Sequence, residues 1–234
     1  MTRTAGSSPS RRTSAGRRRA TGTYAAADAR REAILAAATA AFAQAGYGSS
    51  SLARIAADAG TSATVVVHHF GSKERLLVAV LERHEARTRD RVLALEAAGL
   101  LNGLAPLRDA MVEATAYNLA HPGRLQLFVQ LSAEASDPTH PAHERFRQRY
   151  AESRALHERC LRAAIATGEL RPDANVRAVA HEIPAISDGL QVQWALDPES
   201  TDLRAGLISY FDRLAQALTT DGRTLPPPVT LPPV

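Results

Sequence analysis

The stretch SLARIAADAGTSATVVVHHFGSKERLL, residues 51–77, decides the fold. Its first part places apolar side chains at i, i+3, i+4 and i+7, which predicts a short helix with one buried stripe: Leu52, Ile55, Ala56 and Ala59. Gly60 follows that stripe, at the point where a positive φ most easily ends a helix. Ser50 or Ser51 can cap the first helix, and Thr61 or Ser62 the second. A turn this short makes two helices cross steeply, as in a DNA-reading helix-turn-helix.

The second helix is predicted to run to Phe70. Val66 and Phe70 share one face at i, i+4, which leaves the opposite face for the major groove: Ala63, Thr64, Val67 and His68. The β-branched run TVVV favours a strand by local propensity alone. A helix is still the better prediction, because a capping Ser precedes the run, only Gly71 separates it from the next helix, and no second strand-like run is available to pair with it.

Three motifs in order carry a family resemblance. They are RREAILAAATAAFAQAGY at residues 30–47, IAADAGTS at 55–62 and HHFGSKERLL at 68–77. Over about 50 residues, from near Arg30 to near Leu81, the chain resembles the TetR/AcrR family of bacterial transcriptional regulators. The resemblance implies an all-α homodimer, with a three-helix DNA-binding domain followed by a larger C-terminal domain that holds an inducer pocket and the dimer interface.

Composition agrees with a helical DNA-binding protein. The 234 residues include one Cys, which excludes a disulfide framework, and no apolar run near the length of a membrane span or signal peptide, so we expect a cytoplasmic protein. The net charge is +4, but residues 1–27 hold six arginines and no acid, which leaves the rest of the chain at −2. We expect this arm to be disordered and either to follow a minor groove or to add non-specific affinity only.

Pro and Gly divide the rest of the chain. We expect a DNA-binding domain at 28–72, a ligand-binding and dimerisation domain at 82–220 and a disordered Pro-rich tail at 221–234 without an assigned function. A connecting helix is expected from Ser72 to about residue 98, and its start, to about residue 81, belongs with the DNA-binding domain. Helices are predicted at about 28–45, 106–120, 124–136, 141–167, 175–196 and 202–219.

Two cations are the strongest candidates for DNA contact beyond the second helix. Lys73 is the only lysine, and its place at a helix start suggests an external anion, which by resemblance is a DNA phosphate. Val67 stands where the family usually has Tyr, so Arg54 becomes the best candidate for a guanine contact. The predicted DNA-binding set is Ser51, Arg54, Ser62, Ala63, Thr64, Val67, His68 and Lys73.

The later helices supply two weaker predictions. Polar and polarisable side chains that would enclose a mixed inducer pocket are Met111, Tyr117, Phe128, His157, Cys160, Gln191 and Trp194. Apolar stripes on the last two helices are broad enough to meet a partner subunit, with Ile186, Leu190, Leu207, Phe211 and Leu214 as the predicted dimer interface.

Catalysis and metal binding find little support. No nucleophile elbow, phosphate-binding loop or dinucleotide fingerprint is present, and neither the His68–His69 pair nor the loop at 134–144 has the spacing of a metal site. No enzyme activity, metal or cofactor is therefore expected. The predicted function is a homodimeric repressor of a palindromic operator on double-stranded DNA, released by a small-molecule inducer. The alternatives are a constitutive repressor or architectural protein without ligand, and a ligand-binding protein with weakened DNA reading.

Overall fold

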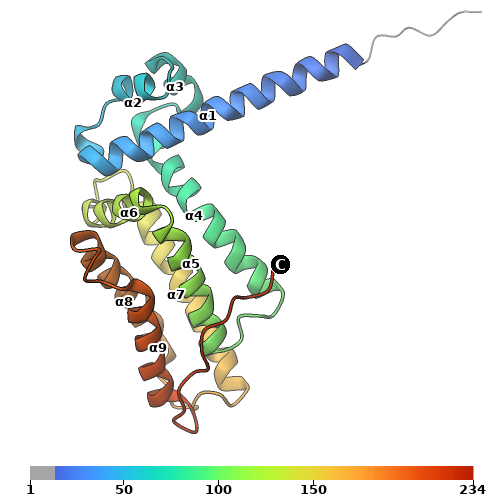
Figure 1. Cartoon of the computed structure of the whole chain (residues 1–234), viewed down its shortest axis with the longest axis vertical. Coiled ribbons are helices and arrows are strands. Elements are labelled where there is room, and N and C mark those ends of the chain that lie inside the picture. Colours follow the sequence, from blue (N-terminus) through green and yellow to red (C-terminus); the bar gives the residue numbers. More distant parts are fainter. Residues whose placement is uncertain (1–13, 234) are drawn as a thin grey trace, which may run out of the picture.

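The computed structural model describes residues 14–233, which form an elongated, all-helical molecule (Figure 1). The helices of this part are α1 (Ser14–Ser49), α2 (Leu52–Asp58), α3 (Ala63–Phe70), α4 (Lys73–Ala97), α5 (Leu104–Leu119), α6 (Pro122–Glu134), α7 (His143–Ala166), α8 (Val176–Leu196) and α9 (Leu203–Leu218). An isolated antiparallel bridge joins Leu170 to Thr219. Within residues 14–233, every helix is too short or too polar to cross a membrane.

Helix α1 begins much earlier than predicted. It starts at Ser14 rather than Asp28, so residues 14–27 are helical and the prediction of a disordered arm is wrong for them. The segment is rich in Ala and Arg, which are strong helix formers, and contains no Pro to stop a helix growing back from the folded part. Residues 1–13 lie outside the described part. At the other end Gly46 has φ 76° and ψ 164°, and this left-handed residue breaks the helix where the sequence predicts its stop.

Helices α1 to α3 and the start of α4 share one apolar core. Ile34, Phe42, Ile55 and Val66 are fully buried in it, and Phe70 is nearly so. Three serines set the helix starts, because Ser51, Ser62 and Ser72 each accept a hydrogen bond from the backbone N–H three residues ahead. The helical prediction for α3 is confirmed: tertiary burial and the Ser62 cap outweigh the strand propensity of TVVV.

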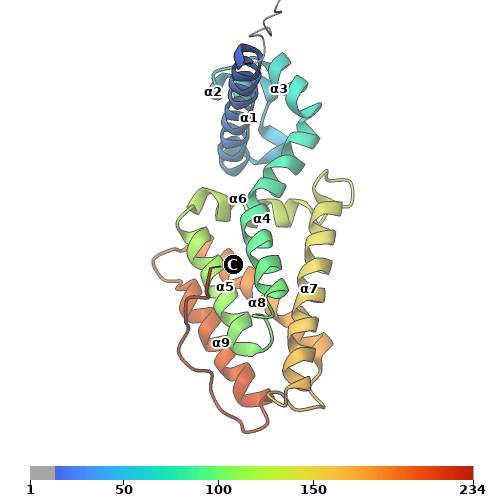
Figure 2. The ribbon, with the colours of Figure 1, turned by 90° about the vertical axis from the view of Figure 1, so that its right-hand side faces the viewer.

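Helix α4 joins this N-terminal head, made of α1 to α3, to a bundle made of α5 to α9 (Figure 2). The bundle helices follow the predicted ranges with small shifts at the ends. α5 begins at Leu104, so that Pro106 lies in its first turn, and α6 begins at Pro122, because a proline at the first helical position loses no hydrogen bond. A second apolar core fills the far end of the bundle and includes Leu95, Leu161, Ile183 and Phe211.

The C-terminal tail is ordered, which corrects the prediction for 221–233. It leaves α9 as an extended chain and runs back along the bundle to end beside α4 (Figure 1). Leu231 is buried in the second core and Leu225 packs against it. Two apolar anchors and several hydrogen bonds to backbone carbonyls offset the conformational entropy that the tail loses when it becomes ordered. The loss is smaller for a Pro-rich tail, because proline already restricts the unfolded chain.

Candidate nucleic-acid interface

Helix α3 presents one face to solvent and one to the core. Val66 is fully buried and Phe70 is 7% exposed, and the guanidinium of Arg31 lies 4.9 Å from the centroid of the Phe70 ring. On the opposite face Thr64 and His68 are exposed, Val67 is 44% exposed and Ala63 is half-buried. The predicted reading residues of α3 therefore lie together on one accessible surface, held rigidly from behind.

The two predicted serines are capping residues. Ser51 Oγ accepts from Arg54 N at 3.2 Å, and Ser62 Oγ accepts from Val65 N at 3.4 Å. Both residues are exposed. A hydroxyl that accepts one bond still has its own proton to donate, so each serine can cap its helix and donate to a phosphate oxygen at the same time.

Lys73 lies at the junction of three elements. Its Nζ donates to Gly48 O at 3.3 Å and stands 4.4 Å from the centroid of the Tyr47 ring, which ties the start of α4 to the corner between α1 and α2. Tyr47 donates in turn to Glu74 Oε1 at 3.3 Å, and burial together with the Glu74 charge raises the pKa of Tyr47 to about 12. An ammonium has three protons, so this bond leaves donors for a phosphate. No local sequence pattern marks Tyr47 as a partner of Lys73 and Glu74, because the three side chains meet only when α4 is folded against the end of α1.

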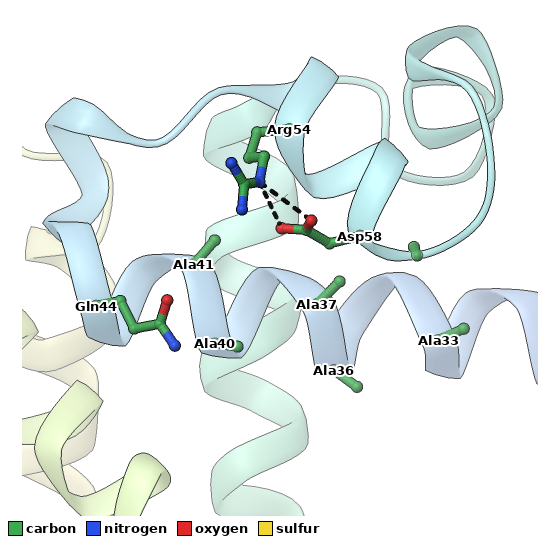
Figure 3. Close-up of a pocket in the computed structure, with 9 residues that line it drawn as sticks. Ala33, Ala36, Ala37, Ala40, Ala41, Gln44, Arg54 and Asp58 are labelled. Atoms are coloured by element: carbon green, nitrogen blue, oxygen red, sulfur yellow. Dashed lines mark hydrogen bonds and ion pairs between the residues drawn. The ribbon is translucent and has the colours of Figure 1, made fainter.

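Arg54 does not point toward α3. Figure 3 shows its guanidinium turned from α2 toward α1, over a depression lined by α1 residues Ala33, Ala36, Ala37, Ala40, Ala41 and Gln44. Its Nε donates to both carboxylate oxygens of Asp58 at 3.1 Å. The Arg54 side chain is 77% exposed, and an exposed pair of this kind contributes only about 0.3–0.5 kcal/mol. A guanine contact by Arg54 therefore requires it to leave Asp58, at a small cost.

The predicted pocket residues do not gather around one cavity. Phe128 of α6 is buried in the first core, which continues from the head into α6 and α7, whereas Met111 and Cys160 belong to the core at the far end of the bundle. Tyr117 accepts a hydrogen bond from Arg124, and Gln191 donates to Ser187 within α8. Trp194 is half-buried near the end of α8, and His157 is 5% exposed, with its pKa lowered to about 4 by burial. Helical periodicity cannot separate residues that face one core from residues that face another.

A charged cluster in the bundle was not predicted. Glu85 on α4 is 5% exposed and pairs with two arginines of α7, Arg145 and, at 3.3 Å, Arg149. Next to it Tyr150 donates to Asp188 of α8 at 2.5 Å, and burial raises the pKa of Asp188. The two residues of each pair are at least 38 positions apart in the sequence, so no local pattern connects them.

Three of the five predicted interface residues are internal. Leu207, Phe211 and Leu214 are 2%, 0% and 8% exposed within the single chain, so they pack in its own core and the prediction that they meet a partner is wrong. Leu190 is half-buried and packs over Gly206. Ile186 is 36% exposed and shares α8 with two further exposed apolar residues, Val192 at 42% and Leu196 at 81%. The stripe on α9 is narrow and faces inward, which leaves α8 as the apolar surface.

Two family models match the chain. Residues 34–80 match bacterial regulatory proteins of the tetR family, and residues 127–206 match the tetracyclin repressor-like C-terminal domain. Among curated proteins no sequence matches significantly.

Solved structures share the whole architecture. SmeT, the repressor of the Stenotrophomonas maltophilia multidrug efflux pump SmeDEF, is 25% identical, with a TM-score of 0.71 over 87% of this chain and 96% of its own. The SmeT–triclosan complex gives 26% identity and a TM-score of 0.77 over 88% and 99%. NalD of Pseudomonas aeruginosa, a secondary repressor of the pump MexAB-OprM, has the same fold at 22% identity, with a TM-score of 0.63 over 82% and 97%.

Proposed function

This chain belongs to the TetR family of bacterial transcriptional regulators, and from that premise we propose that it is a homodimeric repressor. In this proposal each subunit inserts α3 into one half-site of a palindromic operator, and a small molecule bound in the C-terminal bundle releases the DNA. SmeT, one of the similar structures, is a repressor and has been solved with triclosan.

The exposed face of α3 is the observation that carries the proposal. Thr64 and His68 offer hydrogen-bonding groups to base edges, and Val67 can pack against a thymine methyl. The caps at Ser51 and Ser62 and the cation Lys73 surround this face with donors for backbone phosphates. A uniform electrostatic surface would bind DNA without sequence preference, whereas this face is small, specific in shape and mostly uncharged.

Helix α4 supports the coupling between ligand and DNA. Near the middle of α4, Arg83 pairs with Glu32 of α1 at 2.7 Å, and two residues later Glu85 is held by Arg145 and Arg149 of α7. A movement of α7 is therefore passed through α4 to α1 and the head. Since half-sites repeat every 34–36 Å or so along the duplex, a small change in the separation of two heads prevents both from docking.

Exposed apolar side chains on α8 support self-association. Ile186, Val192 and Leu196 lie in the second half of α8, beyond the first half, which is buried in the bundle through Val179 and Ile183. Large exposed apolar residues that gather on one helix are typical of an interface, and a second copy of the same surface would cover them symmetrically.

Selection of duplexes from a random pool tests the proposal. The chain should enrich one palindrome whose half-site centres are about one helical turn, or a multiple of it, apart. Light scattering should give twice the mass of one chain for the free protein, and the mass of two chains plus one duplex for the complex with DNA. Enrichment of no particular sequence would favour the architectural alternative, and no DNA binding at all would favour the ligand-binding alternative.

A further inference from the structure

The tail after α9 packs against α4 and α5, because Arg91 of α4 and Arg108 of α5 both donate to its carbonyls. In Figure 2 it rises across the bundle and ends in front of α4 and α5. Leu231 is 8% exposed and sits in the second core, whereas Val229 two residues earlier is 63% exposed. The less exposed residues of the tail recur at every third position, Leu225, Pro228 and Leu231, as on one face of a polyproline II helix, so the tail has a face that packs and a face that does not.

Arg91 joins three segments at one point. Its Nε and Nη2 donate to the two carboxylate oxygens of Glu113 on α5, at 2.9 and 3.2 Å. Its Nη1 donates to Pro232 O at 2.8 Å, and Nη2 also donates to Leu231 O at 3.0 Å. One guanidinium on α4 thus binds α5 and the tail together.

Arg108 gives the tail a second anchor. It is 1% exposed, and its Nε and Nη2 donate to Asp109 Oδ1 at 2.9 and 2.7 Å. Its Nη1 donates to Pro226 O at 2.6 Å. Without the carbonyl of Pro226 the guanidinium of Arg108 would lose an acceptor, and a buried charged donor without an acceptor is costly. Prolines suit the role, because they offer carbonyl oxygens and have no N–H to satisfy.

We propose that residues 225–233 form a strap that clamps the C-terminal half of α4 to α5 and thereby keeps the two heads of the regulator in position for DNA. Its effect on DNA rests on the proposed function, whereas the clamp itself is a property of the single chain. Release of the strap frees α4 to sample more orientations, so a smaller fraction of molecules is ready to dock. The apparent affinity for DNA falls in proportion to the fraction of molecules that remains ready to dock.

Hydrogen exchange on the full chain tests the clamp without DNA. Two variants weaken the strap from opposite sides: Arg91→Gln removes the guanidinium whose three nitrogens bind Glu113 and the tail, and Leu231→Ser removes the apolar anchor without changing either residue of the Arg91–Glu113 pair. Matched controls are Arg89→Gln, an exposed arginine on the same helix, and Val229→Ser, the exposed residue of the same strap. We expect amide exchange over residues 92–97 of α4 to quicken about fivefold or more in both strap variants and to stay within about twofold in both controls. Equal exchange in Leu231→Ser and Val229→Ser would overturn the clamp.

Binding to the duplex selected by the intact chain tests the regulatory part. Leu231→Ser should weaken it about threefold or more, and Val229→Ser should not. Faster exchange in α4 with unchanged affinity would overturn the effect on DNA. If the intact chain selects no duplex, the proposed function fails, but the exchange result still decides whether the strap clamps α4.

Discussion

Glu85→Gln should be among the most destabilising single changes in the bundle. The carboxylate is 5% exposed on α4 and receives hydrogen bonds or ion pairs from Arg145, which is 11% exposed, and from Arg149, which is 35% exposed. The amide keeps the shape of the side chain but removes its charge and replaces one of its two acceptor oxygens by an NH2 donor, so one of the two guanidinium groups faces a donor and both lose their shared anion. Arg145 retains a second, more distant carboxylate at 3.7 Å, that of Glu152.

The size of the effect follows from burial. Breaking a fully buried ion pair costs about 3–5 kcal/mol. Arg149 is partly solvated and can turn to water, so we expect a cost just below that range, about 2–3 kcal/mol. For a chain of this size each kcal/mol lowers the melting temperature by about 2–4 °C, which predicts a fall of about 5–10 °C.

Thermal and urea unfolding followed by circular dichroism measure the change. The matched control is Glu82→Gln, an exposed carboxylate less than one turn earlier on the same helix. It should change the free energy of unfolding by less than about 0.5 kcal/mol. If Glu85→Gln is as stable as this control, the charged cluster does not hold α4 to α7, and the route from ligand to DNA proposed above is refuted.

Three further outcomes follow from single side chains. Burial lowers the pKa of His157 to about 4 from 6.5, so the neutral side chain contributes its full stability above pH 6.5. That contribution is lost as the pH falls toward 4, and about 2 kcal/mol of it is gone at pH 4.5. His157→Gln should therefore make the melting temperature depend less on pH below 6.5, and a dependence as steep as that of the exposed His68→Gln would count against this. Burial also raises the pKa of Cys160 to about 11, so iodoacetamide should alkylate it about a hundredfold more slowly in the folded chain than in guanidinium, and equal rates would show that the core is open. Val67→Tyr restores the hydroxyl usual in the family and should strengthen binding to the selected duplex about fivefold, whereas Val67→Phe should not; an equal gain in both would assign the effect to apolar contact.

Local signals predicted the head of the molecule well. Ser51, Ser62, Gly60 and Gly71 mark the ends of α2 and α3 within a few residues, and they override the strand propensity of TVVV because each acts on the neighbouring turn. The buried stripe of α2 could be read in the same way. Such signals need no knowledge of what lies across the core.

The errors arise where a distant partner decides the outcome. The tail looks unable to fold, but its carbonyls meet Arg91 and Arg108, which lie 118 to 141 positions earlier. Phe211 was taken for an interface residue because a stripe of apolar residues does not say which neighbour covers it.

The proposed repressor must read bases through the exposed face of α3. A comparison of DNA affinities decides whether it does. It compares the affinity for the selected duplex with that for a scrambled duplex at the same salt concentration, using the intact chain, Thr64→Ala/His68→Ala and a control, His181→Ala, in an exposed residue of α8. We predict that the double change lowers the ratio of the two affinities about tenfold to a hundredfold while the melting temperature and the scrambled-duplex affinity stay unchanged. A ratio that equals that of His181→Ala would contradict the account, because the surface of α3 would then not be the one that reads DNA.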